Sequence, residues 1–344
     1  MAEPILSVRN LSTTFSVRQP GLFAAPLALK AVSDVSFDLG AGETLGIVGE
    51  SGCGKSTLGR SILRLVEPTA GQVLWQGRDL AAFSPAEMRR ARRDLSIIFQ
   101  DPIASLNPRM TVGDIIAEPL RVAEPDLSKK DRRARVERVM AEVGLVPDMI
   151  NRYPHEFSGG QAQRIGIARA VVTEPKLIVC DEPVSALDVS IQAQIVALLD
   201  DLKTRRGLTL LFISHDLSVV RLVSDRILVL YLGRVVETGP RRDVFERPAH
   251  PYTRALLSAA PVPDPAASRS RRRVMLAGDP PSPINPPSGC AFRTRCPIAE
   301  DICAKVPPPL AEVAPGHAGA CHFAGEEARR RLDAVAAAGE RSAA

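Results

Sequence analysis

The sequence predicts an α/β fold organised around one glycine-rich loop, and three observations support this. Residues 49–57 read Gly-Glu-Ser-Gly-Cys-Gly-Lys-Ser-Thr, which fits the pattern G-x-x-x-x-G-K-[ST]. An apolar run, 45–48, precedes the loop, and apolar residues at helical spacing follow it in 58–66. A strand, a glycine turn and a helix in this order are the context in which the pattern binds a polyphosphate. Backbone N–H groups of the glycines and the helix N-terminus would supply the partial positive charge.

Composition and charge limit the class of protein. The 344 residues are enough for one large or two ordinary domains, and 45% hydrophobic with 24% charged residues is typical of soluble globular proteins. No run approaches the ~20 apolar residues of a membrane-spanning helix, and residues 1–10 lack a signal-peptide pattern. We therefore expect a cytoplasmic chain that can still have a membrane partner. Much of the net charge of +5 lies in Arg269 and 271–273, which favours a solvated linker over nucleic-acid binding.

The first hundred residues predict strands around the loop and its helix. Alternating apolar residues predict strands at 5–16 and 31–39, joined by a loop between Val17 and Pro26. Further strands are expected at 71–76 and 95–99, with a capped helix at 84–93 between them. Phe15 ends the first strand, where it can stack on an adenine ring or pack in the core, and the residue alone does not decide between these.

A block of helices interrupts the strands from about 101 to 172. It includes a basic helix capped by Ser128, whose apolar stripe ends at Gly144. Another helix begins at Ser158, a good N-cap, and the glycines that follow expose backbone N–H groups. This is a second anion-binding helix start, formed by Ser158, Gly159, Gly160 and Gln161.

Acidic and histidine side chains follow the next buried strands. The run 177–182 ends in Asp181 and Glu182, of which the first can hold Mg²⁺ and the second can polarise an attacking water. After a helix at 189–203, the strand 209–214 ends at His215, in a position where open α/β sheets bind ligands. A hairpin that turns at Gly233 is expected to close the sheet.

The composition changes after residue 239, where prolines become frequent and four cysteines gather. Cys290, Cys296, Cys303 and Cys321 have the spacing C-x5-C-x6-C-x17-C. In a cytosolic protein this favours metal over disulfide bonds, but the spacing alone does not choose between a [4Fe-4S] cluster and zinc. His317 and His322 can serve as ligands if the metal is zinc. The remaining alternative is four unliganded thiols.

These motifs, in this order and spacing, resemble those of the ATP-binding-cassette (ABC) ATPases over roughly the first 245 residues. Within that family, the residues 49–57, 99–102, 105–109 and 250–253 resemble ATPase subunits of bacterial oligopeptide and dipeptide importers, as does the Cys-rich tail. The loop is more similar to the F-type than to the D-type subunit, and nickel importers of the same group remain an alternative. The resemblance implies a P-loop NTPase cassette with an antiparallel β subdomain and an inserted helical subdomain (101–172), occupying 1–245. A small Cys-rich extension at 246–344 would follow.

The resemblance also implies the roles of single residues. The catalytic residues would be Glu182, His215 and Gln100, with Glu182 as the general base and His215 in contact with the γ-phosphate. Phe15 would stack on adenine. Mg²⁺ would be bound by Ser56, Gln100 and Asp181. ATP would be contacted by Gly49, Ser51, Gly52, Cys53, Gly54, Lys55, Ser56 and Thr57, whereas Ser158, Gly160 and Gln161 would serve the nucleotide of a partner cassette paired head to tail. Gly159 and Asp188 would also belong to the nucleotide-binding residues.

The expected partners follow from the same resemblance. They are a second ATPase subunit, expected to be a D-type sister in a heterodimer, two transmembrane permease subunits and an extracytoplasmic binding protein, with no nucleic acid. The chain would then sit peripherally on the cytoplasmic face of the inner membrane. The expected cofactors are ATP, Mg²⁺ and a [4Fe-4S] cluster, with zinc as the alternative. Rival hypotheses are a soluble ABC ATPase acting on DNA or ribosomes and an iron–sulfur redox sensor.

Overall fold

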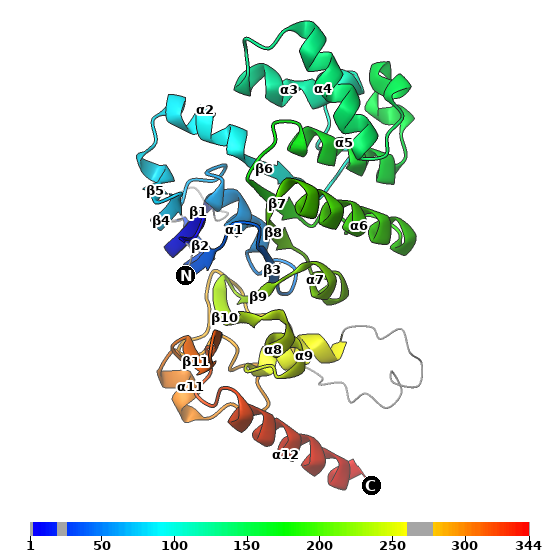
Figure 1. Ribbon diagram of the computed structural model, residues 1–344. Helices are drawn as coiled ribbons and strands as arrows, with labels where there is room; N and C mark the ends of the chain where they lie inside the picture. Colours follow the sequence, from blue (N-terminus) through cyan, green and yellow to red (C-terminus); the bar gives the residue numbers. More distant parts are fainter. Residues whose placement is uncertain (1–2, 19–25, 260–277, 344) are drawn as a thin grey trace.

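The computed structural model describes residues 3–18, 26–259 and 278–343, and it contains two sheets (Figure 1). The larger sheet has the strand order β11-β12-β10-β9-β3-β8-β7-β6, and the smaller one has the order β2-β1-β4-β5. The predicted α/β fold is thus confirmed. The arginines at 269–273 and most of the predicted 17–26 loop lie outside the described residues. Within the described residues, no helix is long and apolar enough to cross a membrane.

Parallel strands form the centre of the larger sheet. They are β3 (Thr44–Val48), β6 (Leu95–Ile98), β7 (Leu177–Asp181), β8 (Thr209–Ile213) and β9 (Arg226–Tyr231). Every residue of β3, β7 and β8 is buried, which explains why these segments read as continuous apolar runs. Parallel strands place their carboxyl ends at one edge, so the glycine-rich loop, Gln100, Asp181 and His215 all emerge there.

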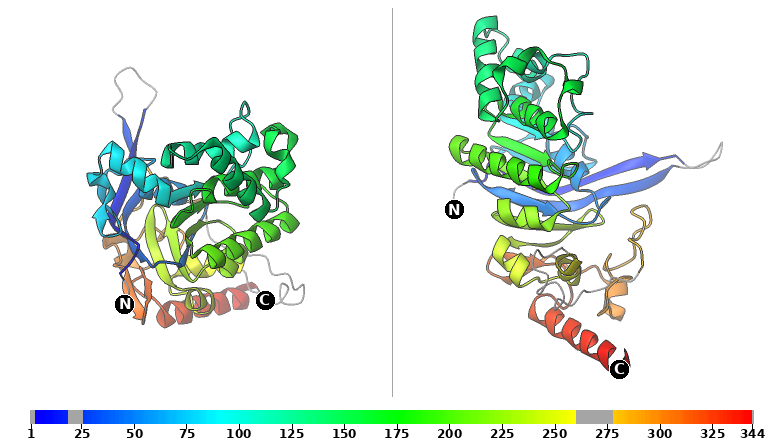
Figure 2. Two further views of the ribbon diagram at one scale, coloured as in Figure 1. Left: turned by 45° about the horizontal axis from the view of Figure 1, so that its top comes forward. Right: turned by 90° about the vertical axis from the view of Figure 1, so that its right-hand side faces the viewer.

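The smaller sheet is antiparallel and lies beside the glycine-rich loop. It consists of β1 (Leu6–Val17), β2 (Leu27–Leu39), β4 (Ala70–Trp75) and β5 (Arg78–Asp79). The β1–β2 ribbon projects from the body of the molecule (Figure 2). Its inner face packs with the helix α1 (Lys55–Ile62) in a shared hydrophobic core. The strand β2 begins four residues earlier than the predicted 31, because its pairing with β1 extends to Val17 and Leu27.

The helical block lies beyond β6, the outer strand at one edge of the larger sheet (Figure 1). It contains α3 (Val112–Ala123), α4 (Lys129–Glu142), two short 3₁₀ turns and α5 (Gly159–Val171). Ahead of it, α2 (Pro85–Asp94) has the predicted capping box of Ser84 and Glu87. The apolar stripe of α4 is buried, and arginines on its outer face pair with Glu124, Glu137 and Glu174. These pairs support the interpretation of the basic helix as a solvated face.

Two more helices border the carboxyl edge. They are α6 (Val189–Arg206), capped by Asp188, and α7 (Leu217–Val223), capped by Asp216. The strands β9 and β10 (Arg234–Pro240) pair antiparallel and turn at Gly233, as predicted.

The C-terminal extension continues the larger sheet. After α8 (Arg241–Glu246) and α9 (Pro251–Ala259), it contains α11 (Asp301–Lys305), β11 (Ala311–Ala314), β12 (His317–Gly319) and α12 (Glu326–Ala343). The strand β12 pairs with β10, with Thr238 opposite Ala318. Phe292, Ile298 and Leu332 are buried, so this Pro-rich segment contributes residues to packed cores. The division into 1–245 and 246–344 stays a prediction.

A buried polar junction joins the extension to β10. The Glu237 carboxylate is fully buried and accepts hydrogen bonds from the backbone N–H groups of Ala249 (2.8 Å) and His250 (2.9 Å) and pairs with His317 Nε2 (2.8 Å). His322 Nε2 contacts the Val306 carbonyl oxygen at 2.9 Å. Both histidines considered as zinc ligands therefore have protein partners, because Glu237 and a carbonyl provide their hydrogen bonds.

We expect His250 to make the protein less stable in acid. Burial lowers the pKa of His250 from 6.5 to about 3, so the unfolded chain binds a proton that the folded chain excludes as the pH falls from 6.5 toward 3. At pH 5 this costs about 2 kcal/mol of unfolding free energy. In the wild type, His250 Nδ1 accepts a hydrogen bond from the Tyr252 N–H at 3.0 Å. His250→Asn keeps an acceptor for this N–H.

Urea unfolding at pH 7.5 and pH 5 measures this effect. The wild type should lose about 2 kcal/mol more between the two pH values than His250→Asn. Equal losses in both proteins would contradict the assignment of this acid sensitivity to His250.

Candidate nucleotide-binding and hydrolysis site

The glycine-rich loop of residues 49–57, named here the phosphate loop, has a backbone that only glycine allows at two positions. Gly54 has φ +103° and caps α1, and a Cβ there would lie 2.0 Å from the Ala31 carbonyl oxygen. Gly49 has φ +155°, and a Cβ there would lie 2.2 Å from the Leu230 carbonyl oxygen. The strands β2 and β9 thus lie so close to the loop on its two sides that they leave no room for a side chain at these two positions.

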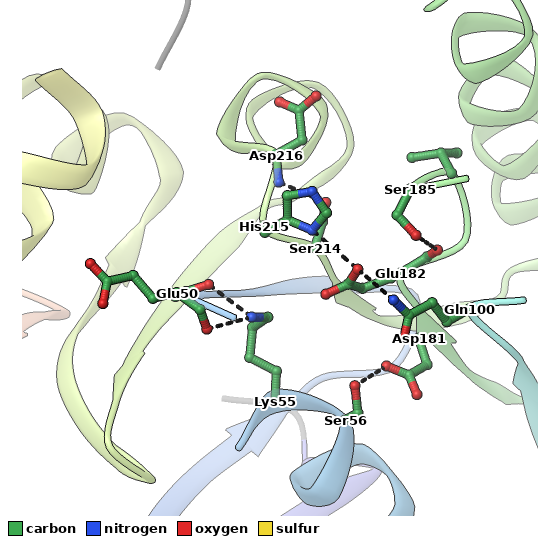
Figure 3. A network of polar contacts seen from close by, with 12 residues as sticks. Glu50, Lys55, Ser56, Gln100, Asp181, Glu182, Ser185, Ser214, His215 and Asp216 are labelled. Atoms are coloured by element: carbon green, nitrogen blue, oxygen red, sulfur yellow. Dashed lines mark hydrogen bonds and ion pairs between the residues drawn. The ribbon is translucent and has the colours of Figure 1, made fainter. Parts of the chain in front are cut away.

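Lys55 is buried and points back into the phosphate loop (Figure 3). Its Nζ donates hydrogen bonds to the carbonyl oxygens of Gly49 (2.8 Å) and Glu50 (3.0 Å). A buried ammonium needs such partners, and phosphate oxygens can replace them. The lysine is therefore held where the loop would enclose a polyphosphate.

The predicted magnesium ligands lie together at the ends of β6, β7 and α1. Ser56 Oγ donates to Asp181 Oδ1 at 2.6 Å, and Asp181 Oδ2 pairs with Arg60 at 3.2 Å. Gln100 lies next to them and reaches Glu182 (Figure 3). Hydroxyl, carboxylate and amide oxygens are ligands that Mg²⁺ prefers, so this set fits the ion. Sequence analysis missed Arg60, although it lies one helical turn after Ser56.

Glu182 is fixed between the two other predicted catalytic residues. Its Oε2 atom lies 3.1 Å from His215 Nδ1 and 3.2 Å from Gln100 Nε2. The Glu182 backbone has φ +48°, a left-handed conformation that is unusual for a non-glycine residue. Hydrogen bonds from Glu182 N to the Ile213 carbonyl and from Ser185 Oγ to the Glu182 carbonyl support it. Such backbone strain concentrates at functional sites.

A cavity of about 640 Å³ lies above the phosphate loop, and its lining joins most of the predicted site. Phe15 is 39% exposed and lines it, so the alternative of a core phenylalanine was wrong. A second cavity of about 850 Å³ shares Gln100, Glu182 and His215 and extends along Asp101 and Ser105. The predicted residues in the first lining are Phe15, Ser51, Gly52, Cys53, Gly54, Lys55, Ser56, Thr57, Gln100, Glu182 and His215.

The second predicted anion site has the predicted capped helix start but lies apart from the first site. Ser158 caps α5, its N–H donating to Gln161 Oε1 at 3.0 Å and its Oγ accepting from the Gln161 N–H at 3.4 Å. Asp188 caps α6 in the same way through the Ile191 N–H at 3.0 Å. None of the residues 158–161 or Asp188 lines either cavity.

The four cysteines of the extension are free thiols. Burial raises the pKa of Cys296 to about 12, with charges at Cys321, Cys290 and Cys303 as smaller causes in the same direction. Burial likewise raises the pKa of Cys321 to about 11. Within the described residues, however, no group of three or more His, Cys, Asp or Glu residues could hold a metal ion. The structure therefore does not support the expected cluster in this arrangement, in which Cys303 is buried and the other three cysteines are partly buried.

Two contacts from the extension to the phosphate loop were missed by sequence analysis. Arg295 pairs with the Glu50 carboxylate, and Tyr252 Oη accepts a hydrogen bond from the Glu50 N–H. Residues more than 200 positions apart in the chain leave no local pattern, so no sequence signal could have identified them.

The fold and the site together define an ATPase of the ABC class, and comparisons with known proteins agree. The ABC transporter family model matches residues 32–185, and the model of the oligopeptide/dipeptide transporter C-terminal region matches 236–303. The chain belongs to the ABC transporter ATPase family. It is 56% identical over 321 residues to the oligopeptide transport ATP-binding protein OppF of Haemophilus influenzae, covering 93% of this chain and 97% of that protein.

Other relatives extend the comparison. OppF of Salmonella typhimurium is 58% identical over 308 residues, which are 89% of this chain and 92% of that protein. Among solved structures, the dimeric post-hydrolysis state of the ATP-binding cassette MJ0796, bound to ADP and Pi, has a TM-score of 0.62 and 30% identity. That match covers 69% of this chain and 99% of the other.

Proposed function

We propose that this chain hydrolyses ATP to power the import of di- and oligopeptides across the cytoplasmic membrane. The observation that carries the proposal is the similarity to two oligopeptide transport ATP-binding proteins over 93% and 89% of the chain. The match of the extension to a C-terminal region of oligopeptide/dipeptide transporters favours peptides over nickel as the solute.

Uptake of a labelled tripeptide by cells that lack this chain tests the proposal. The wild-type gene should restore uptake, whereas a gene encoding Glu182→Gln should not. Normal peptide uptake in the deletion strain, combined with lost nickel uptake, would replace peptides by nickel as the solute.

The roles proposed for the site residues follow from their positions. Lys55 and the backbone N–H groups of the phosphate loop bind the phosphates, and Phe15 packs on adenine. Ser56, Asp181 and Gln100 would hold Mg²⁺, which would neutralise charge on the phosphates. Glu182 Oε2 accepts a proton from the attacking water, and His215 contacts the γ-phosphate. Positioning and electrostatics supply most of the catalysis in such a transfer.

The two separate anion sites support a head-to-tail dimer, in which Ser158 and its glycines contact the nucleotide of the partner. The dimeric relative MJ0796 is consistent with this. The partner we propose is a D-type sister subunit, and two permease subunits would anchor the pair at the cytoplasmic face of the membrane. An extracytoplasmic binding protein would deliver peptides to the permease subunits from the other side. The cavity along Gln100, Asp101 and Ser105 is open to receive a permease segment.

We expect Ser158→Arg to separate ATP binding from hydrolysis. Because Ser158 lies outside the chain's own cavity, the affinity of the isolated chain for MgATP should stay within about twofold. The ATPase rate of the assembled transporter should fall about tenfold or more, since the substitution reaches the partner's nucleotide.

The matched control is Ser84→Arg, which removes the cap of α2 with the same capping-box geometry. Equal losses of ATPase rate in the two variants would show that capping, rather than nucleotide contact, explains the Ser158 effect.

We also propose that the four cysteines bind a [4Fe-4S] cluster, with zinc as the alternative. The mutual effects on the thiol pKa values support their proximity. The described arrangement forms no metal-ready group, so binding would require the thiols to approach one another. Metal and sulfide analysis of anaerobically purified protein tests this. About four irons with matching sulfide indicate the cluster, one zinc indicates a structural site, and no metal refutes both.

A further inference from the structure

The C-terminal extension binds the side chain of one residue of the phosphate loop. Arg295 donates to both carboxylate oxygens of Glu50, from Nη1 at 2.8 and 3.1 Å and from Nη2 at 3.1 Å. The Arg295 side chain is only 8% exposed and that of Glu50 is 24% exposed. A forked, largely desolvated pair of this kind is among the stronger and more directional polar contacts in proteins.

The same residue is also held through its backbone. The Glu50 N–H donates to Tyr252 Oη at 2.8 Å, and the Tyr252 ring is completely buried. That ring packs edge-on against Tyr231, with centroids 4.7 Å apart, and against Phe292 at 5.4 Å. Since Phe292 lies three positions before Arg295, the contacts of Arg295 and Tyr252 with Glu50 belong to one packed unit.

The third contact of Glu50 leads to the phosphate-binding lysine. Its carbonyl oxygen accepts from Lys55 Nζ at 3.0 Å (Figure 3). The Glu50 carboxylate points away from Lys55 and does not line the cavity above the loop. The position of the Glu50 backbone therefore determines where the Lys55 ammonium lies. The Glu50 carboxylate is directed toward Arg295.

We propose that Arg295 and Tyr252 are positioning residues for ATP binding, which hold Glu50 and cancel its charge beside the phosphates. A nucleotide triphosphate is strongly anionic, so an unpaired carboxylate within the phosphate loop would repel it. Arg295 neutralises this carboxylate from outside the cavity, and Tyr252 holds the backbone of Glu50 in place. The proposal rests on the ATPase family of the chain and is independent of the transported solute.

Binding of a fluorescent ATP analogue with Mg²⁺ to the full chain tests the charge effect. Arg295→Met should raise the Kd about tenfold, whereas Glu50→Gln should change it less than about threefold. The double variant should bind more tightly than Arg295→Met, because the uncompensated carboxylate is gone. In the assembled transporter, kcat at saturating ATP should stay within about twofold for Arg295→Met while KM rises.

Arg331→Met is the matched control, since Arg331 lies in the same extension and pairs with Glu300 and Glu327. It should leave the Kd unchanged. An unchanged Kd in Arg295→Met, or a double variant that binds no better than Arg295→Met, would overturn the proposal. If Arg295→Met does not fold, Arg295→Lys and Tyr252→Phe decide. Each should fold and raise the Kd about threefold, and wild-type affinity in both would refute the positioning role.

Discussion

Replacing Glu182 by glutamine is expected to slow ATP hydrolysis at least about 100-fold while ATP affinity stays within about threefold. Glu182 Oε2 is held between His215 Nδ1 at 3.1 Å and Gln100 Nε2 at 3.2 Å, at the rim of the cavity above the phosphate loop. An amide has nearly the same shape but cannot accept a proton from water. The variant should therefore bind ATP and remain in the bound state.

Phosphate release by the assembled transporter and analogue binding by the isolated chain measure the two effects separately. Glu174→Gln is the matched control, because Glu174 is an exposed acid that pairs with Arg138 in the helical block. Hydrolysis by Glu182→Gln at a rate near that of the wild type would remove Glu182 from the role of general base.

Replacing Lys55 by methionine is expected to weaken ATP binding about 100-fold or more. Methionine keeps most of the length and the apolar stem of lysine but has no ammonium to bind phosphate oxygens. The Gly49 and Glu50 carbonyl oxygens, which Lys55 reaches at 2.8 and 3.0 Å, would lose this donor as well. The loss should appear as a higher Kd in analogue binding and as a higher KM in ATPase assays.

Lys203→Met serves as the control for Lys55→Met, because Lys203 pairs with Asp225 away from the cavity. Thermal unfolding of both variants shows whether the fold survives. An affinity within about threefold of the wild type in folded Lys55→Met would contradict the phosphate-binding role of this lysine.

Sequence analysis predicted the catalytic edge because its signals are local. Each buried strand is a continuous apolar run with the functional residue at its end, as Asp181 ends β7 and His215 comes two residues after β8. Parallel strands then bring these positions to one edge without further information. The capping patterns at Ser84, Ser128 and Ser158 were equally local, and all three form the predicted caps.

The contacts of the extension could not be predicted in the same way. The grip of Arg295 on Glu50 and the pairing of β12 with β10 join distant parts of the chain. The extension is rich in proline and has weak apolar periodicity, so its sequence did not indicate a packed segment. The order of this segment comes from long-range contacts. The crowding of four cysteines in the extension favoured a metal site, but sequence spacing does not determine how close the thiols come.

The pairing of β12 with β10 also affects the order in which the chain can fold during synthesis. Until residue 319 has left the ribosome, β10 is an open sheet edge with unpaired N–H and C=O groups, a template for association with other chains. In the finished protein the outermost strand at this edge is β11, which is four residues long and has only exposed residues, Glu312 among them. A short, charged edge of this kind discourages further strand addition, so the segment that covers β10 also protects the sheet against aggregation.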